Sequence, residues 1–447
     1  MKFFSDLPKK RQKWLNPELI FYIGVFFLPF ENFFFAPSAG WAAISPVIFA
    51  IYILLNLKRV FRTIVKLKNI ILFFVFAVIL GSLTAFLNNV SLLDYVNAFI
   101  PLALGAISLF SFYIFYDKKK DLKTVVDLVV IAYAICAVIG FFEYLTIRSG
   151  NTAFRDWIGT FMKRNYLLEG GTGRAQFFFT EPSFIGMHIF GILLPLFWLS
   201  RRKDLLFVIF LFLIESVYFG VGVRVIVDFA VVAILYFGYL LIIHKKAKFI
   251  PLILLVLGLG FSYAYNNNLR IQKIVKDGIY ADGSLASRYF RIQSSAIGYT
   301  KAPGKTLVGF GLGNAIEPIH LGYDEAASSY TSSFTREVDA LDYRKTDFHD
   351  DSVAYSLYFR FISEFGLIMT LIAIIYLVKI TKESRLPQRW LYLAIILYIY
   401  IQFESLGFYA LWLFVATMLF TKKTDISERV LNLRIKDNLK RIKSHGK

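Results

Sequence analysis

The residues that could do chemistry in this chain are charged side chains that stand within or beside long apolar runs. A charge at the centre of a bilayer costs about 2.5 kcal/mol or more, so such residues are usually kept for function or neutralised in pairs. Arg224 with Asp228, and Arg360 with Glu364, are four residues apart, so each pair could neutralise itself along one helix. The full set comprises Glu31, Glu143, Glu181, Glu215, Arg224, Asp228, Arg360, Glu364 and Glu404.

Arginine side chains near one membrane face indicate what a site there would bind. Guanidinium groups match phosphate oxygens in a forked geometry and stay charged when they are partly dehydrated. Arg224, near the outside end of its predicted span, and Arg288, in an outside loop, therefore suit the diphosphate of a lipid carrier. Arg174 and Arg291 also lie in predicted outside loops. Arg224 and Arg288 could instead be surface or helix-pairing arginines, so both interpretations stay open at this point.

Two residues are candidates for the base that would activate a hydroxyl group. His349, followed by Asp350 and Asp351, offers a general base with an orienting carboxylate. A partly buried carboxylate such as Glu181 could take that role instead. Residues 349–351 could also ligate a divalent cation, but three adjacent ligands make a poor cage and no second cluster is visible. We therefore expect neither a metal nor another cofactor.

The elements that must position these residues are transmembrane helices. The chain has 447 residues, of which 57% are hydrophobic and 18% aromatic, whereas a soluble domain is about 45–50% apolar. About 20 apolar residues are needed to cross the hydrocarbon core as a helix. Twelve segments are candidates for such spans, although several are short or closely joined and eleven to thirteen spans would fit the sequence. They lie near 17–35, 41–57, 69–87, 97–116, 124–147, 180–199, 204–219, 222–243, 249–266, 353–378, 389–402 and 405–421.

The placement of Lys and Arg predicts the topology of these spans. Cytoplasmic loops carry an excess of basic residues. With the N-terminus inside, the short outside connections near 36–40, 88–96, 220–221 and 403–404 hold none, whereas every inside connection holds at least three. Both termini are thus predicted to be cytoplasmic. The net charge of +19 would suggest nucleic acid in a soluble protein, but here it follows the inside loops, and the basic tail suits anionic lipid.

The predicted organisation is an all-α polytopic membrane protein with one large outside loop. Residues 1–266 hold the first nine spans, 267–352 the loop, 353–421 the last three spans and 422–447 the basic cytoplasmic tail. Residues 148–179 form an outside segment that is either a helix in the membrane interface or a packed lid. In the large loop, Ser287 to Tyr299 predicts a short helix, and Pro303 to Ala315 a turn-rich stretch of close backbone contacts.

At this point the chain resembles the bacterial O-antigen polymerase and O-antigen ligase superfamily. The residues that carry the resemblance are RAQFFFTEPSFIG (174–186), Arg224 in GVRVIVDF, Ser287–Arg288 followed by Pro303 and GFGLGN (309–314), and His349 ahead of Glu364–Phe365–Gly366. The likeness covers about residues 130 to 380. One departure is Asp350, where family members often have Asn.

The resemblance implies a helical membrane fold of the GT-C-like glycosyltransferase type and a metal-independent, inverting sugar transfer at the periplasmic face of the inner membrane. Arg224 and Arg288 would hold the donor diphosphate, and His349 or Glu181 would activate the acceptor hydroxyl. The implied partners are an undecaprenyl-diphosphate-linked oligosaccharide, membrane lipid and a chain-length regulator protein, with no nucleic acid.

Three functions are compatible with these observations. A polymerase would add the growing chain to another lipid-linked repeat unit, and this is the function we favour. A ligase would move the finished chain to lipid A core. A transporter would move lipid-linked or free sugar without forming a bond, and it would need a wide charged cavity through the membrane. The intramembrane charges gather toward one face instead, which argues mildly against a transporter.

Overall fold

The protein is built from helices. The computed structural model describes residues 16–32, 43–118, 122–162, 175–219, 223–244, 250–267, 269–330, 338, 342 and 356–422, and within them it contains no strand. The elements are α1 (Pro17–Phe26), α2 (Ile44–Leu55), α3 (Leu57–Lys66), α4 (Lys68–Leu87), α5 (Leu92–Lys118), α6 (Leu122–Ser149), α7 (Thr152–Gly159), η2 (Pro182–Phe184), α9 (Ile185–His188), the π-helical η3 (Ile189–Leu193), α10 (Leu194–Ser200), α11 (Lys203–Tyr218), α12 (Val223–His244), α13 (Ile250–Asn267), α14 (Leu269–Asp277), η5 (Ile279–Ala281), α15 (Gly283–Lys301), α16 (Pro303–Val308), α17 (Glu317–Ser328), α19 (Leu357–Glu383), α20 (Arg389–Ile399) and α21 (Tyr409–Phe420).

Several of these helices have the length and the apolar character of membrane spans, which identifies the chain as a membrane-embedded protein. Six helices in the described part are long and apolar enough, or seven if α2 and α3 count as one bent span. Three shorter apolar helices, α1, α20 and α21, accompany them. Each of the twelve predicted segments overlaps one or more helices, so the helical fold is confirmed. The count of twelve spans stays a prediction.

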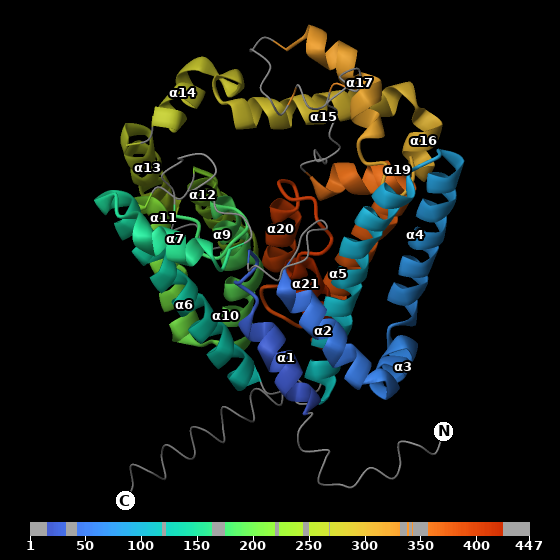
Figure 1. The fold of residues 1–447 in the computed structure, drawn as a ribbon, viewed down its shortest axis with the longest axis horizontal. Coiled ribbons are helices and arrows are strands. Elements are labelled where there is room, and N and C mark those ends of the chain that lie inside the picture. Colours follow the sequence, from blue (N-terminus) through green and yellow to red (C-terminus); the bar gives the residue numbers. More distant parts are fainter. Residues whose placement is uncertain are drawn as a thin grey trace, which may run out of the picture.

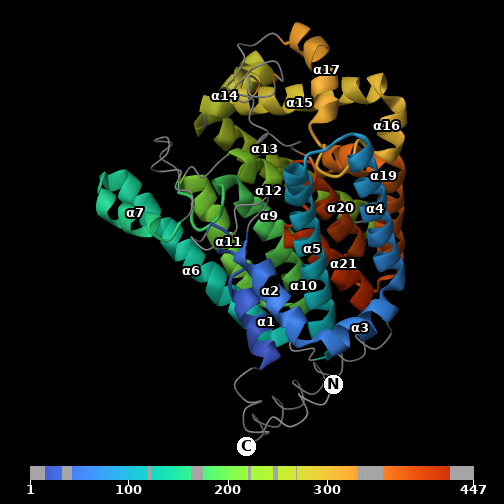
Figure 2. The same ribbon diagram turned by 45° about the vertical axis from the view of Figure 1, so that its right-hand side comes forward.

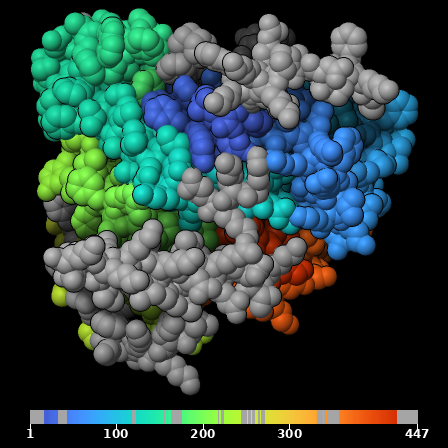
Figure 3. Space-filling view, turned by 90° about the horizontal axis from the view of Figure 1, so that it is seen from below, coloured from blue at the N-terminus to red at the C-terminus, as the bar shows by residue number. Residues whose placement is uncertain are grey.

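The helices form a bundle that is closed at one end by a cap of α14 to α17 (Figures 1 and 2). Figure 1 shows α6 and α10–α13 on one side of the bundle, α4, α5 and α19–α21 on the other, and α15 running above both. The opposite end carries α3. From that end (Figure 3), the blue region of α1 to α4 and the green region of α10 to α12 lie on opposite sides of the view.

The end of the bundle opposite the cap is basic, and the chain bends there. Helix α3, predicted as a plain connection, continues α2 after a bend of 97°. Asn56 makes this bend, because its side chain donates to the Tyr52 carbonyl at 2.9 Å. Lys66 of α3 pairs with Asp117 of α5 at 2.6 Å. Since this is where the sequence predicts cytoplasmic loops, the cap end corresponds to the predicted outside.

The first predicted span, 17–35, is a helix only as far as Phe26. The chain then turns, and the backbone N–H groups of Glu31 and Asn32 donate to the carbonyl of Phe178 at 3.1 and 3.0 Å. Phe178 belongs to residues 175–181, a non-helical segment that lies against the bundle and leads into η2 and α9. The helix ends early because the chain bonds to this segment.

The cap has its own small apolar core, formed where α15 and α17 pack together. Asp282 begins α15 by accepting a hydrogen bond from the backbone N–H of Leu285 at 2.9 Å, a typical N-cap. The predicted helix from Ser287 to Tyr299 is therefore confirmed and is slightly longer than expected. Beside the bundle, α7 (Thr152–Gly159) is a short helix within the 148–179 segment, of which residues 163–174 lie outside the described part. Its Ile158 is buried and its Trp157 is 57% exposed.

A glycine-rich segment, 309–313, fastens the cap to the bundle. Its backbone N–H groups at Phe310 and Leu312 donate to the carbonyls of Ser363 in α19 and Gly81 in α4, at 2.6 and 3.0 Å. Gly311 has φ +114° and approaches the backbone of Ala85 so closely that a side chain would collide with it. The predicted stretch of close backbone contacts is thus present, after a short helix, α16, that was not predicted.

Candidate functional site

The first half of the charged cluster, here called half-site A, consists of Glu181, Arg224, Asp228 and Arg288. Arg224 lies in the first turn of α12, and its Nε is 4.0 Å from Oδ2 of Asp228, one helical turn later. Tyr398 of α20 donates a hydrogen bond of 2.6 Å to Oδ1 of Asp228. Asp228 therefore joins two helices and faces the guanidinium group that it partly neutralises.

Half-site A is shaped by close packing around Arg224. Its guanidinium lies 5.8 Å from the ring centre of Phe184, within the range of a cation–π contact. Its Nη2 is 3.4 Å from the sulfur of Met187. Gly186 has no side chain, and any Cβ there would collide with the Asp228 carboxylate. The sequence EPSFIGM (181–187) thus forms a wall that fits the α12 charges.

The second half of the cluster, half-site B, consists of Arg291, Arg360, Glu364 and Glu404. Arg360 and Glu364 are one turn apart on α19, and Arg360 Nε donates to Glu364 Oε1 at 3.1 Å. Glu404, in the connection between α20 and α21, is close enough to Arg360 and Arg291 for their charges to interact. Half-site B therefore repeats the composition of half-site A, with two arginines and two carboxylates.

Helix α15 supplies one arginine to each half-site. Arg288 and Arg291 are three residues apart, so they share one face of this helix. Arg288 interacts electrostatically with Arg224 and Asp228, and Arg291 with Glu404. Because α15 crosses above the bundle (Figure 1), the cap contributes charges to both half-sites.

Glu181 connects the two half-sites. Its charge interacts with Arg224 in half-site A and with Glu404 in half-site B. Its backbone is extended and is followed by Pro182, the first residue of η2, and its Oε2 accepts a hydrogen bond of 3.1 Å from Ser183. A half-buried carboxylate between two arginine-bearing pockets is placed to take a proton from a group held by either of them.

Several buried polar atoms in the cluster have no hydrogen-bond partner within the described part of the chain. They include Nε of Arg224, Oε2 of Glu364 and Oε2 of Glu404. Leaving a buried polar group unsatisfied costs about 1–3 kcal/mol, and more for a charged group. Unsatisfied atoms of this kind are common where a ligand completes the hydrogen bonding. Half-site A thus presents a donor, and half-site B presents two acceptors.

A second polar network lies behind Glu181 and is fully hydrogen bonded. In this network, His188 bonds to Oε1 of Glu31 through Nε2 and to the hydroxyl of Tyr133 through Nδ1, the latter at 2.6 Å. Glu31 Oε2 accepts from the backbone N–H of Thr180 at 3.3 Å. Glu143 accepts from the backbone N–H groups of residues 176 and 177, at 2.9 and 2.6 Å. Two buried carboxylates therefore hold the segment that carries Glu181.

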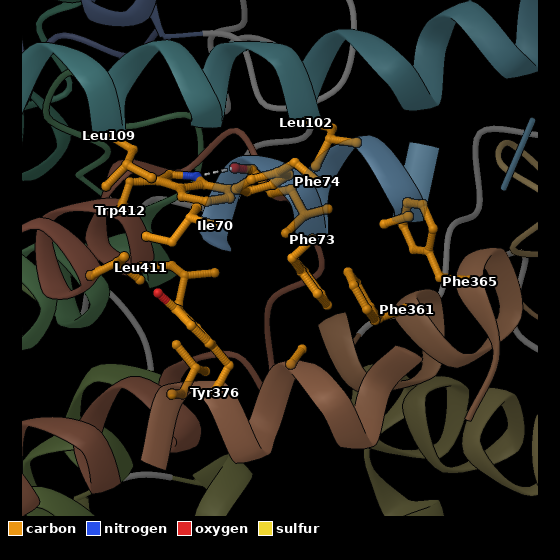
Figure 4. A pocket seen from close by; sticks show the side chains of 15 residues that line it. Ile70, Phe73, Phe74, Leu102, Leu109, Phe361, Phe365, Tyr376, Leu411 and Trp412 are labelled. Carbon is orange, nitrogen blue, oxygen red and sulfur yellow. Dashed lines mark hydrogen bonds between the residues drawn. The ribbon is translucent and has the colours of Figure 1, made fainter. Parts of the chain in front are cut away.

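An apolar cavity of about 90 Å³ borders half-site B. Figure 4 shows its walls: Phe73 and Phe74 from α4, Leu102 and Leu109 from α5, Phe361 and Phe365 from α19, and Trp412 from α21. Phe361 and Phe365 directly follow Arg360 and Glu364 in the sequence. The cavity has room for a few carbon atoms of an alkyl chain and is smaller than a typical ligand pocket.

The structure brings together four of the seven residues predicted for the site: Glu181, Arg224, Arg288 and Arg291. The other three, Arg174, His349 and Asp350, lie outside the described residues. Within the described part, no three His, Cys, Asp or Glu side chains are placed to hold a metal.

The sequence shows Asp228, Arg360, Glu364 and Glu404 as charges within the membrane, but none of them is among the seven predicted site residues. For Asp228, Arg360 and Glu364 the signal is the repeated spacing of four residues between Arg and acid, which equally fits self-neutralisation. For Glu404 it is the position near the outside end of a predicted span. Tyr398 was not singled out at all.

Comparisons with known proteins do not extend this picture. No family model matches the chain, and no curated protein or solved structure matches it. The function therefore has to be argued from the cluster itself.

Proposed function

We propose that this protein is a membrane glycosyltransferase that polymerises lipid-diphosphate-linked glycan chains on the cap side of the bilayer. The observation that carries the proposal is the convergence of two arginines from two helices beside Glu181. Arg224 comes from α12 and Arg288 from α15, and the charge of Arg224 interacts with those of Arg288 and Glu181. Such a pair of guanidinium groups suits a diphosphate, which carries several oxygens that need charged donors.

The location of the cluster fits a substrate that is part lipid and part sugar. The charges lie where the apolar helices meet the polar cap, so a headgroup could bind there while its chain stays in the bilayer. A soluble nucleotide-sugar donor would not need these features.

The proposed reaction is a direct displacement. The hydroxyl oxygen of the acceptor attacks the anomeric carbon of the donor glycan and forms the new glycosidic bond. The bond between that carbon and the diphosphate oxygen breaks, and the polyprenyl diphosphate leaves with the electron pair. The hydroxyl proton passes to Glu181 or to His349. The arginines of half-site A stabilise the charge that develops on the leaving diphosphate.

Elongation of lipid-linked repeat units by the purified protein in lipid nanodiscs tests this proposal. The wild type is expected to form a ladder of longer glycans, and a chelator should not stop it. Arg224→Gln and Arg288→Gln should each lower the rate by about 100-fold or more. Arg202→Gln is the matched control, because Arg202 pairs with Asp127 at 2.7 Å far from the cluster.

Other products would identify other functions. Transfer of the glycan to lipid A core with no ladder would identify a ligase. Movement of lipid-linked or free sugar across vesicles with no change in chain length would identify a transporter. Full elongation by Arg224→Gln and Arg288→Gln would reject the proposed site even if the wild type polymerises.

The base can be identified separately by comparing Glu181→Gln with His349→Gln. Removing the base should lower the maximal rate strongly, whereas removing a residue that only binds substrate should mainly raise KM. Substitution of the true base should also remove the acidic limb of the pH–rate profile. If both variants keep that limb, neither residue is the base.

A further inference from the structure

Half-site B differs from half-site A in what it leaves unsatisfied. In half-site A the orphaned atom is a donor, Nε of Arg224. In half-site B the orphaned atoms are carboxylate oxygens, Oε2 of Glu364 and Oε2 of Glu404. The side chain of Glu364 is only 1% exposed, so bulk water does not complete its hydrogen bonding. The ligand of half-site B must therefore supply hydrogen-bond donors.

A second diphosphate does not meet this requirement. Phosphate oxygens are acceptors, so they cannot donate a hydrogen bond to the unpartnered Oε2 atoms of Glu364 and Glu404. A sugar fits better, because each hydroxyl group donates one hydrogen bond and accepts others. Glu364 and Glu404 would accept from hydroxyl groups, while Arg291 and Arg360 would donate to their oxygens.

We propose that half-site B is the acceptor subsite, where Glu364 and Glu404 accept hydrogen bonds from the sugar hydroxyls of the incoming glycan. This inference rests on the proposed function and deepens it, because it separates the donor diphosphate in half-site A from the acceptor sugar in half-site B. Glu181 interacts with Arg224 on one side and Glu404 on the other, so it stands at the boundary where donor and acceptor meet.

The fold supports this division of labour. The two half-sites are carried by opposite sides of the bundle, α12 for A and α19 for B, and α15 spans both. Arg360 is fixed by its bond to Glu364 Oε1, and Glu364 Oε2 is left for a ligand. Glu404 is held between the ends of α20 and α21, and its Oε2 is likewise buried and unoccupied by any described donor.

The experiment uses two probes with the full-length protein in nanodiscs. The first is undecaprenyl diphosphate without sugar, which reports on half-site A. The second is the repeat-unit oligosaccharide released from its lipid, which reports on half-site B. Glu404→Gln and Glu364→Gln are expected to weaken oligosaccharide binding by at least about tenfold, the scale of one lost hydrogen bond to a charged group, while undecaprenyl diphosphate binding changes by less than about twofold.

Two controls make the result specific. Arg224→Gln should give the reverse pattern, with weaker binding of undecaprenyl diphosphate and unchanged binding of the oligosaccharide. Glu383→Gln lies at the far end of α19, where it pairs with Lys422, and should change neither. In the elongation assay, Glu404→Gln should raise KM for the oligosaccharide acceptor more than it lowers the maximal rate.

Each other outcome overturns the inference in a distinguishable way. If the oligosaccharide binds Glu404→Gln and Glu364→Gln as tightly as the wild type, half-site B is not the acceptor subsite, and the proposed function stands. If both variants lose both probes and melt earlier, these carboxylates are structural and the inference fails. If the wild type binds neither probe, the proposed function fails together with the inference.

Discussion

Two groups of buried charged residues lie close together in this protein, and they are built in opposite ways. In the Glu31–Tyr133–His188 network, each named oxygen and nitrogen has a hydrogen-bond partner. In the arginine–carboxylate cluster of half-sites A and B, several buried atoms, among them Oε2 of Glu364 and Oε2 of Glu404, have none within the described residues. Removing the charges of either group from water costs free energy. Only in the first group do hydrogen bonds within the protein offset that cost.

The difference separates support from function. The satisfied network holds residues 175–181 in place and exposes nothing to a ligand. The unsatisfied cluster sits where the cap meets the bundle and keeps donors and acceptors available. Functional sites often give up stability in this way, since groups that must bind substrate cannot all be bonded to one another. Mutations in the satisfied network should therefore mainly lower stability, whereas mutations in the unsatisfied cluster should mainly lower activity.

The largest effect on stability is expected from Glu31→Ala. The substitution leaves His188 and the backbone N–H of Thr180 without their acceptor in a buried site. Breaking a buried charged pair costs about 3–5 kcal/mol, so the variant should melt far earlier than the wild type in detergent and express poorly. The matched control is Glu325→Ala, which breaks an exposed pair with Lys301 at 2.8 Å and should cost less than about 1 kcal/mol. Equal melting temperatures for the two variants would contradict the assignment of the network to structural support.

A smaller loss is expected from Gly311→Ala, in the segment that fastens the cap over the cluster. Its φ of +114° is strained for any residue with a side chain, and the new Cβ would lie 2.5 Å from the backbone of Ala85. We expect a loss of about 2 kcal/mol or more, seen as a lower melting temperature. Gly304→Ala is the control, because nothing lies within 4 Å of its Cβ position in α16. A Gly311→Ala variant as stable as Gly304→Ala would show that the segment can move away from α4.

The sequence predicted the helices well because the apolar runs are long and their composition leaves little choice. It predicted less well where the backbone bonds to something distant. Helix α1 stops at Phe26 because Glu31 and Asn32 bond to Phe178, more than 140 residues away, and no local pattern encodes that contact. Helix α3 was missed for a different reason, since its basic residues were interpreted only as a topology signal.

The site shows the same division. Arg224 and Arg288 could be named as candidates from residue type and position, although a surface or helix-pairing role was equally compatible with the sequence. Half-site B could not be named in this way, because the spacing of Arg360 and Glu364 equally describes a pair that neutralises itself. Only the fold shows that Glu364 uses one oxygen for that pair and leaves the other unsatisfied, and that the charge of Glu404 interacts with those of Arg360 and Arg291 from two other elements.

Within the cluster, Glu404→Gln should change stability very little. The substitution keeps the size of the side chain and removes attraction to Arg291 and Arg360, but it also removes repulsion by Glu181 and Glu364. We expect the free energy of unfolding to stay within about 1 kcal/mol of the wild type, as measured by thermal melting in the same detergent. A loss as large as that of Glu31→Ala would place Glu404 with the structural network and remove the contrast between the two groups.

The smallest effect concerns pH and lies in the cap, where His320 of α17 is partly buried. Burial lowers the pKa of His320 below its ordinary value, and Asp342 opposes this only in part. The unfolded cap then binds more protons than the folded cap, so its stability should fall as the pH drops below about 6.5 and level off below the folded-state pKa. The protection factors of α15 and α17 amides, which correct the exchange rates for their intrinsic pH dependence, should therefore be lower at pH 5 than at pH 7.5. His320→Asn should remove most of that difference, whereas Asp342→Asn should increase it, because the carboxylate that favours the charged imidazole is gone. Equal protection factors at both pH values in the wild type would show that the charge state of His320 does not affect the stability of the cap.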